Sequence, residues 1–190
     1  MYEAAEDPYC YPGTAVLKNM PGLRTQEELD SFEAASTMQR ADEPLPTGRL
    51  SLSHYQAIHH HLFQDVYPWA GKFRSVRMSK DQSAFCYPEY VAQEMKALFA
   101  GLAAKRLLRN LTLPAFAQEA AAFLATLNAI HPFREGNGRT QTLFLALLAD
   151  QASHPLDLER LSPKPFLAAM VRSFQGDMKP LRAQIEYLVG

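Results

Sequence analysis

Residues His131 to Arg139, with the sequence His-Pro-Phe-Arg-Glu-Gly-Asn-Gly-Arg, bring a base, an acid, cations and glycines into one short segment. Glycines let backbone N–H groups approach a ligand closely, and a helix start presents free N–H groups and a positive dipole end. Because Gly136 and Gly138 lie at a predicted helix start, this segment predicts an anion site. Asn137 adds an amide donor and Arg139 a fork-shaped guanidinium, and both groups suit phosphate oxygens.

Glu135 and His131 add reactive groups to this site. A phosphate would repel Glu135 unless a cation lay between them, and Mg²⁺ is normally held by one or two carboxylates together with substrate phosphates. The expected ligand is therefore a magnesium nucleotide. His131, with an ordinary pKa near ~6.5, is the candidate general base at neutral pH. Phe133 is interpreted as an apolar anchor of the loop. A plain turn before a helix would not need this set of residue types.

Apolar residues at helical spacing predict about seven helices around this loop. The helix before the loop extends from about Thr112 to Ile130 and is broken at His131-Pro132. The other helices are expected to begin near Thr25, Ser51 or Ser53, Pro88, Gly138, Phe166 and Leu181. The first should stop at Pro44 and the second should continue until Pro68. This order of elements predicts an all-α domain with a small β appendage.

The period of the sequence changes between Gly71 and Cys86. Alternate residues there differ in character, which predicts a β-hairpin over residues 71–86. The candidate docking strand for an extended segment of a target protein consists of Arg74, Ser75, Val76, Arg77 and Met78. A solvated basic edge is the alternative. Residues 1–24, rich in Pro and Gly, are expected to form an irregular arm.

Composition indicates an ordinary folded protein. The chain has 190 residues, 47% of them hydrophobic and 21% charged, and a formal net charge of −1. We therefore expect a single domain over residues 1–190, with neither nucleic acid nor membrane as partner. Two cysteines and no export signal favour the cytoplasm. The consecutive residues His59, His60 and His61 lack the spacing of a metal site.

The segment His131–Arg139 resembles the signature of the Fic (filamentation induced by cAMP) proteins, usually written H-x-F-x-[D/E]-G-N-G-R-x-x-R. The resemblance extends to the segments 7–9, 11–14 and 61–71. It implies a Fic-type helical bundle with a β-hairpin flap. It also implies transfer of AMP from ATP to a Tyr, Thr or Ser hydroxyl of a target protein. By position, His131 would then be the base, Glu135 the Mg²⁺ ligand and residues 136–139 the phosphate cradle.

Thr142 departs from this signature, which has a second arginine there to reach the outer phosphate of ATP. In the family, that arginine also pairs with an inhibitory glutamate on an [S/T]-x-x-x-E-[G/N] helix. Glu135 is the one glutamate followed by Gly or Asn in this sequence. The resemblance therefore implies a toxin-like protein, or an effector delivered into another cell, with a separate antitoxin supplying the glutamate. The alternatives are transfer of another phosphate-containing group and a degenerate nucleotide- or partner-binding module.

Overall fold

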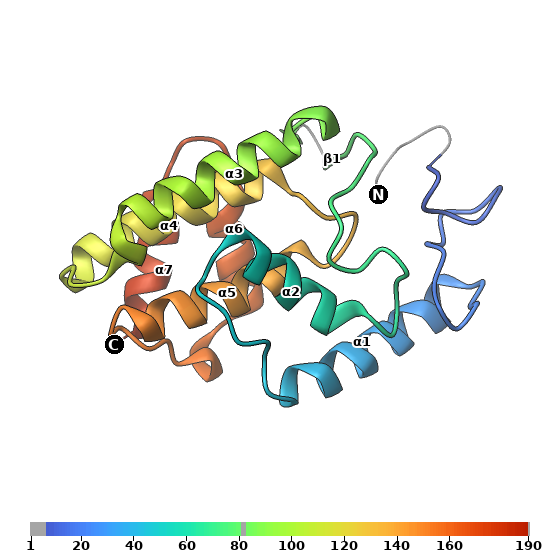
Figure 1. Ribbon diagram of the computed structural model, residues 1–190, viewed down its shortest axis with the longest axis horizontal. Helices are drawn as coiled ribbons and strands as arrows, with labels where there is room; N and C mark the ends of the chain where they lie inside the picture. The colour runs from blue at the N-terminus through green and yellow to red at the C-terminus, as the bar shows by residue number, and fades with distance from the viewer. Residues whose placement is uncertain (1–6, 81–82, 190) are drawn as a thin grey trace.

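The structure is a computed structural model that describes residues 7–80 and 83–189. The described residues form seven α-helices, two short 3-10 helices (η) and one two-stranded sheet (Figure 1). In chain order the elements are α1 (Gln26–Asp42), α2 (Leu52–Phe63), β1 (Ser79–Lys80), β2 (Ser83–Ala84), α3 (Pro88–Ala104), η1 (Arg106–Leu108), α4 (Leu113–Ile130), α5 (Asn137–Gln151), η2 (Leu158–Arg160), α6 (Pro163–Phe174) and α7 (Lys179–Val189). The predicted all-α fold is confirmed.

Local sequence signals set the ends of the first helices. Thr25 caps α1, and its hydroxyl oxygen accepts a hydrogen bond from the Glu28 N–H at 3.3 Å. Ser51 caps α2 by accepting from the His54 N–H at 3.3 Å. The expectation that this second helix continues to Pro68 was wrong. It ends at Phe63, because the chain turns there and the N–H groups at 66 and 67 both bond to the Phe63 carbonyl.

A buried aromatic cluster joins the helices around the loop. The Tyr55 ring of α2 lies 5.6 Å from Phe99 of α3, 5.5 Å from Phe133 of the loop and 5.4 Å from Phe144 of α5, measured between ring centroids. Helix α3 packs beside α4, and α6 and α7 also pack against α4 (Figure 1). Residues far apart in the sequence therefore form one core beneath the loop.

The hairpin is shorter than expected. Strand pairing is limited to Ser79–Lys80 with Ser83–Ala84, in antiparallel register. The segment 71–78 forms no strand, because its Arg74 N–H bonds to the carbonyl of Pro132 in the loop at 2.9 Å. Burial still alternates along this segment: Arg74 and Met78 are buried, whereas Ser75 and Arg77 are exposed. The tip of the expected hairpin, residues 81–82, lies outside the described residues.

Candidate active site

The loop between α4 and α5 uses two left-handed residues to reverse the chain. His131 follows α4 with φ 50° and ψ 64°, and its N–H bonds to the Leu127 carbonyl at 3.0 Å. Gly136 caps the start of α5 with φ 80°. Helix α5 begins at Asn137, so the last residues of the predicted loop form its first turn. Their N–H groups have no partner within the helix and lie at its positive dipole end.

Asn137 and Phe133 close this loop internally. The Phe133 ring is fully buried, and its centroid lies 3.7 Å from that of the His59 ring. The Asn137 side chain accepts from the Phe133 N–H at 2.9 Å and donates to the Phe133 carbonyl at 2.8 Å. Both polar atoms of this side-chain amide thus hold the loop, and the contact of this amide with phosphate stays a prediction. Its backbone N–H remains on the helix start.

The two glycines of the loop have different surroundings. A Cβ at Gly136 would lie 2.3 Å from carbon atoms of the Phe63 ring, and the positive φ also disfavours a side chain there. A Cβ at Gly138 would meet no described atom within 4 Å. Gly136 is thus required by packing, whereas Gly138 leaves open space at the start of α5.

His131 is held between the flap and the end of α4. Its ring stacks on the Phe85 ring at 4.0 Å with an interplanar angle of 16°. Its Nδ1 atom is buried, so Nε2 is the ring nitrogen that can face a substrate. The His131 carbonyl accepts a hydrogen bond from Arg74 Nε at 2.7 Å.

Glu135 lies at the edge of the helix start, with its side chain about one-third exposed. Its Oε1 accepts from the Gly136 N–H at 2.8 Å and lies 3.8 Å from Arg139 Nη2. Burial raises the pKa of the Glu135 carboxyl, and the nearby Glu33 carboxylate raises it further. The site therefore favours a cation beside this carboxylate.

His59 fixes the backbone at Glu135. Its Nδ1 accepts from the Gly71 N–H at 2.8 Å, so the ring proton is on Nε2, which lies 3.0 Å from the Glu135 carbonyl and donates to it. Complete burial lowers the pKa of His59 to about 4. The sequence excluded His59 from a metal site by its spacing but did not reveal this contact with the loop.

Arg139 is oriented by helix α1, a contact that the sequence did not reveal. Its Nη2 forms an ion pair with Glu33 Oε1, and the Tyr67 hydroxyl donates to Glu33 Oε2. Arg139 Nη1 also donates to the Thr37 hydroxyl at 3.2 Å. Glu33 lies between buried Leu29 and Thr37 on one face of α1. A charged residue on the buried face of a predicted helix is the signal that could have identified it.

The five predicted flap residues face different directions. Arg74 and Met78 are buried, at 2% and 5% exposure. The Ser75 N–H donates to the Tyr9 hydroxyl at 3.1 Å. The Arg77 guanidinium lies 4.3 Å above the Tyr87 ring. Within residues 7–80 and 83–189, the N–H groups of Val76 and Arg77 have no hydrogen-bond partner. These two N–H groups are therefore the donors that an incoming strand could use.

Neither position 142, which is a threonine here, nor Arg134 supplies a second cation to the proposed phosphate site. The Thr142 hydroxyl donates to the Gly138 carbonyl at 3.1 Å, within its own helix. Arg134 forms a buried ion pair with Asp7 of the N-terminal arm at 2.7 Å. In the part of the chain that the structure describes, no group of three or more His, Cys, Asp or Glu side chains could hold a metal ion.

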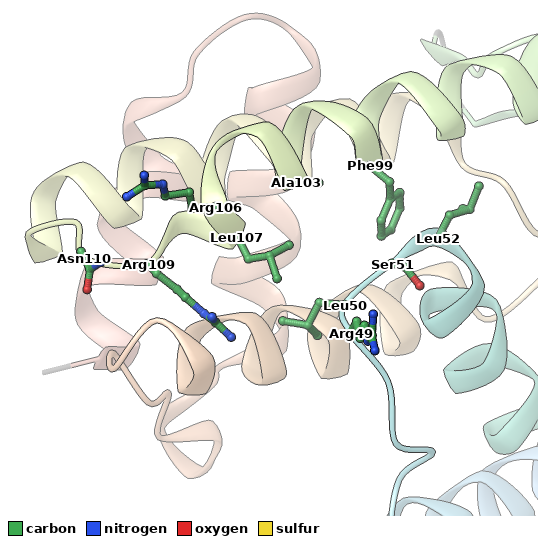
Figure 2. A pocket seen from close by; sticks show the side chains of 10 residues that line it. All are labelled: Arg49, Leu50, Ser51, Leu52, Phe99, Ala103, Arg106, Leu107, Arg109 and Asn110. Carbon is green, nitrogen blue, oxygen red and sulfur yellow. The ribbon is translucent and has the colours of Figure 1, made fainter.

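One hollow borders the described site and another lies away from it. One, of about 520 Å³, is formed by β2, the start of α3 and the end of α4, and Phe85 and Ile130 line it beside His131. Tyr87 and Tyr90 at its rim are 49% and 53% exposed. The other, of about 500 Å³, lies at the N-terminal end of α2, and none of the predicted site residues lines it (Figure 2).

Residues 49–149 match the sequence profile of the Fic/DOC family. The chain is 53% identical over 189 residues to a protein of Sinorhizobium fredii named probable protein adenylyltransferase y4lH, covering 99% of this chain and 98% of that protein. It is 37% identical over 187 residues to protein adenylyltransferase VbhT of Bartonella schoenbuchensis, covering 97% of this chain and 39% of VbhT.

Solved structures agree with the fold. The BepC protein of Bartonella tribocorum with bound AMPPNP matches with a TM-score of 0.84 and 26% identity, covering 95% of each chain. An N-terminal Fic domain of Bartonella quintana with bound ADP matches with a TM-score of 0.85 and 27% identity, covering 95% of this chain and 93% of that one.

Among the described residues, no helix is both long and apolar enough to cross a membrane.

Proposed function

The chain belongs to the Fic/DOC family, and on that premise we propose that it is a protein adenylyltransferase in which His131 is the general base. The observation that carries this proposal is the short loop between α4 and α5, which has His131 at one end and Gly136, the N-cap of α5, at the other. The left-handed turn at His131 and the one at Gly136 bring an imidazole, a carboxylate and a helix N-terminus together in one loop.

The reaction transfers AMP from ATP to a hydroxyl side chain of the target protein. The hydroxyl oxygen attacks the α-phosphorus and forms a new P–O bond. The bond from that phosphorus to the oxygen leading to the β-phosphate breaks, and pyrophosphate leaves with the bonding electrons. His131 Nε2 takes the proton of the attacking hydroxyl, because Nδ1 is buried. The flap places Phe85 against the ring and so orients Nε2.

The phosphates of ATP are assigned to the first turn of α5. The N–H groups of residues 137–139 can donate to phosphate oxygens, and the open space at Gly138 admits them. Arg139, with its side chain 41% exposed, supplies the cation, and Glu33 holds its guanidinium at the helix start. An arginine at this position can form charge-assisted hydrogen bonds to the same phosphates.

Glu135 is the proposed Mg²⁺ ligand. The structure fits this role, because Oε1 bonds to Gly136 whereas Oε2 accepts no hydrogen bond from any described residue. When bound, Mg²⁺ would neutralise charge on the phosphates that leave. The chain itself holds Glu135 in place through His59.

The target protein is proposed to dock on the flap. Support comes from the N–H groups of Val76 and Arg77, which can pair with an extended segment of the target. The hollow beside Phe85 gives that face apolar surface next to His131. These features would present a Tyr, Thr or Ser hydroxyl to the base.

A separate antitoxin is proposed as the regulator. Support comes from these 190 residues, in which Glu135 is the one glutamate followed by Gly or Asn, so the inhibitory motif is not among them. Cys10 and Cys86 are both free thiols, which is typical of a reducing compartment, and we propose the cytoplasm.

Labelled ATP tests the proposed function directly. The protein is incubated with cell lysate and ATP that carries the label on either the α- or the γ-phosphate, and protein bands are examined for label. We expect a band with the α-label alone. A band with the γ-label would indicate phosphate transfer instead, and the absence of any band would favour a binding module without turnover.

A further inference from the structure

Arg74 is a buried cation that bonds to backbone carbonyls. Its side chain is 2% exposed. In a protein interior, a charged group without hydrogen-bond partners would be very costly. Nε donates to the His131 carbonyl at 2.7 Å, and Nη2 donates to those of Ile130 at 3.1 Å and Cys86 at 2.6 Å. Nη1 donates to the Val76 carbonyl at 2.6 Å. Such an arrangement fixes the relative positions of four backbone groups at once.

Two of these carbonyls belong to the end of helix α4. The last carbonyls of a helix have no partner within it and lie at its negative dipole end, which a cation stabilises. Here the residue after the helix is His131, in a left-handed conformation that glycine usually occupies. Histidine adopts this conformation at a cost, so something must hold it there. Arg74 supplies that support by bonding to the carbonyls of Ile130 and His131 themselves.

The other two carbonyls belong to the flap. Val76 precedes β1 and Cys86 follows β2, so Arg74 holds both arms of the hairpin. The flap also reaches the loop through the Arg74 N–H, which bonds to the Pro132 carbonyl, and it reaches the last turn of α4 through the Cys86 N–H, which bonds to the carbonyl of Ala129 at 3.0 Å. One side chain therefore joins the docking edge of the flap to the backbone of the general base.

We propose that Arg74 is a positioning residue for the transfer reaction, which holds His131 Nε2 at the distance from the flap that a docked hydroxyl requires. This inference rests on the proposed function, and it assigns Arg74 no contact with the target. A base displaced by about 1 Å can slow a reaction on the order of a hundredfold. Loss of Arg74 should therefore reduce the turnover rate while leaving ATP binding at the start of α5 largely unchanged.

Arg74→Met and Arg74→Lys test this proposal. The apparent kcat and the KM for ATP are measured with the α-label at a fixed lysate concentration, and rates are expressed per ATP-binding site so that unfolded protein does not count. For Arg74→Met we expect kcat to fall about a hundredfold, with the KM for ATP within about threefold of wild type. Arg74→Lys keeps the charge but bonds fewer carbonyls, so its kcat should lie between those of the wild type and Arg74→Met.

Asn19→Ala is the matched control. Asn19 is also buried and bonds to backbone carbonyls, those of Leu17 at 2.8 Å and Leu23 at 2.9 Å, but it bonds to none of the described residues of the loop or flap. It should lower the melting temperature with little change in kcat. If the Arg74 variants behave as this control does, with a lower melting temperature and little change in kcat, or if their KM for ATP rises as much as their kcat falls, the inference is overturned. If the wild type itself transfers no AMP, the proposed function fails instead.

Discussion

At the scale of single residues, the loop depends on two left-handed positions with different requirements. Gly136 has no room for a side chain, because the Phe63 ring lies where a Cβ would be. His131 has a side chain that the chemistry needs, and its surroundings hold the backbone in a disfavoured conformation. The residue types of the loop could be read from the sequence. The closure of the loop by Asn137 could not, because it depends on how the turn folds.

Gly136→Ala should destabilise both the fold and the phosphate site. The positive φ alone disfavours alanine by about 1–3 kcal/mol, and contact with the Phe63 ring adds to this. We expect a lower melting temperature and weaker ATP binding, measured by thermal unfolding and calorimetric titration. Gly138→Ala is the control for stability, since its Cβ would enter open space. Equal stability of Gly136→Ala and wild type would contradict the packing described here.

Thr142→Arg should strengthen the grip on ATP. The Thr142 hydroxyl bonds within α5 and carries no charge. An arginine there could form a charge-assisted hydrogen bond to phosphate, which contributes about 1.5–3 kcal/mol, or roughly ten- to a hundredfold in affinity or turnover. We expect the arginine variant to transfer AMP faster and to pair strongly with an inhibitory glutamate, measured by ATP titration with and without a cognate antitoxin. An arginine variant that binds ATP no better and is no faster would mean that the natural nucleotide does not need this contact.

At the scale of elements, the flap shows the limit of a periodic pattern. The alternation between Gly71 and Cys86 predicted too much strand, and within it the structure alternates buried Arg74 and Met78 with exposed Ser75 and Arg77. Helix ends were predicted best where a local signal exists, as at Thr25 and Ser51. Strand pairing depends on a partner, and here the partner of Arg74 is the loop at Pro132, which local sequence does not specify.

Arg77→Pro tests target docking by the flap. Proline removes one of the two N–H groups that a target strand could use, and a lost hydrogen bond of this kind corresponds to up to about tenfold. We expect AMP transfer to the target to slow by about this factor while ATP affinity is unchanged. Arg77→Ala, which keeps the N–H and removes the same side chain, is the matched control. Equal losses in both variants would assign the effect to the guanidinium rather than to strand pairing.

At the scale of the whole molecule, each part of the loop is held by a different element. Helix α1 holds Arg139 through Glu33, helix α2 holds Glu135 through His59, and the N-terminal arm holds Arg134. All three contacts join residues far apart in the chain. The sequence therefore predicted the family, the helices and the loop that carries the candidate site residues, but not the side chains that hold this loop, because nothing local encodes which distant side chain contacts it.

His59 should make stability depend on pH. Its pKa is about 4 in the folded protein against about 6.5 when unfolded, so the unfolded chain binds the proton more readily. The stabilisation is complete above pH ~6.5 and is lost as the pH falls toward 4, by on the order of 3 kcal/mol. Denaturant unfolding should show this slope, and His59→Gln, which can keep both hydrogen bonds, should flatten it. His60→Gln changes an exposed histidine and should leave the pH dependence of stability unchanged. A wild-type protein whose stability does not fall between pH 6.5 and 4 would contradict a neutral, buried His59.

The central claim is that His131 removes the proton from the target hydroxyl. The most direct measurement is the rate of α-label transfer by His131→Ala at an ATP concentration that saturates both proteins, with ATP affinity and thermal unfolding measured alongside. We expect transfer to be abolished, while ATP binding and the fold remain largely intact, because the proposed phosphate site is the start of α5 and does not include the imidazole. Transfer by His131→Ala at a rate near that of the wild type would contradict the account.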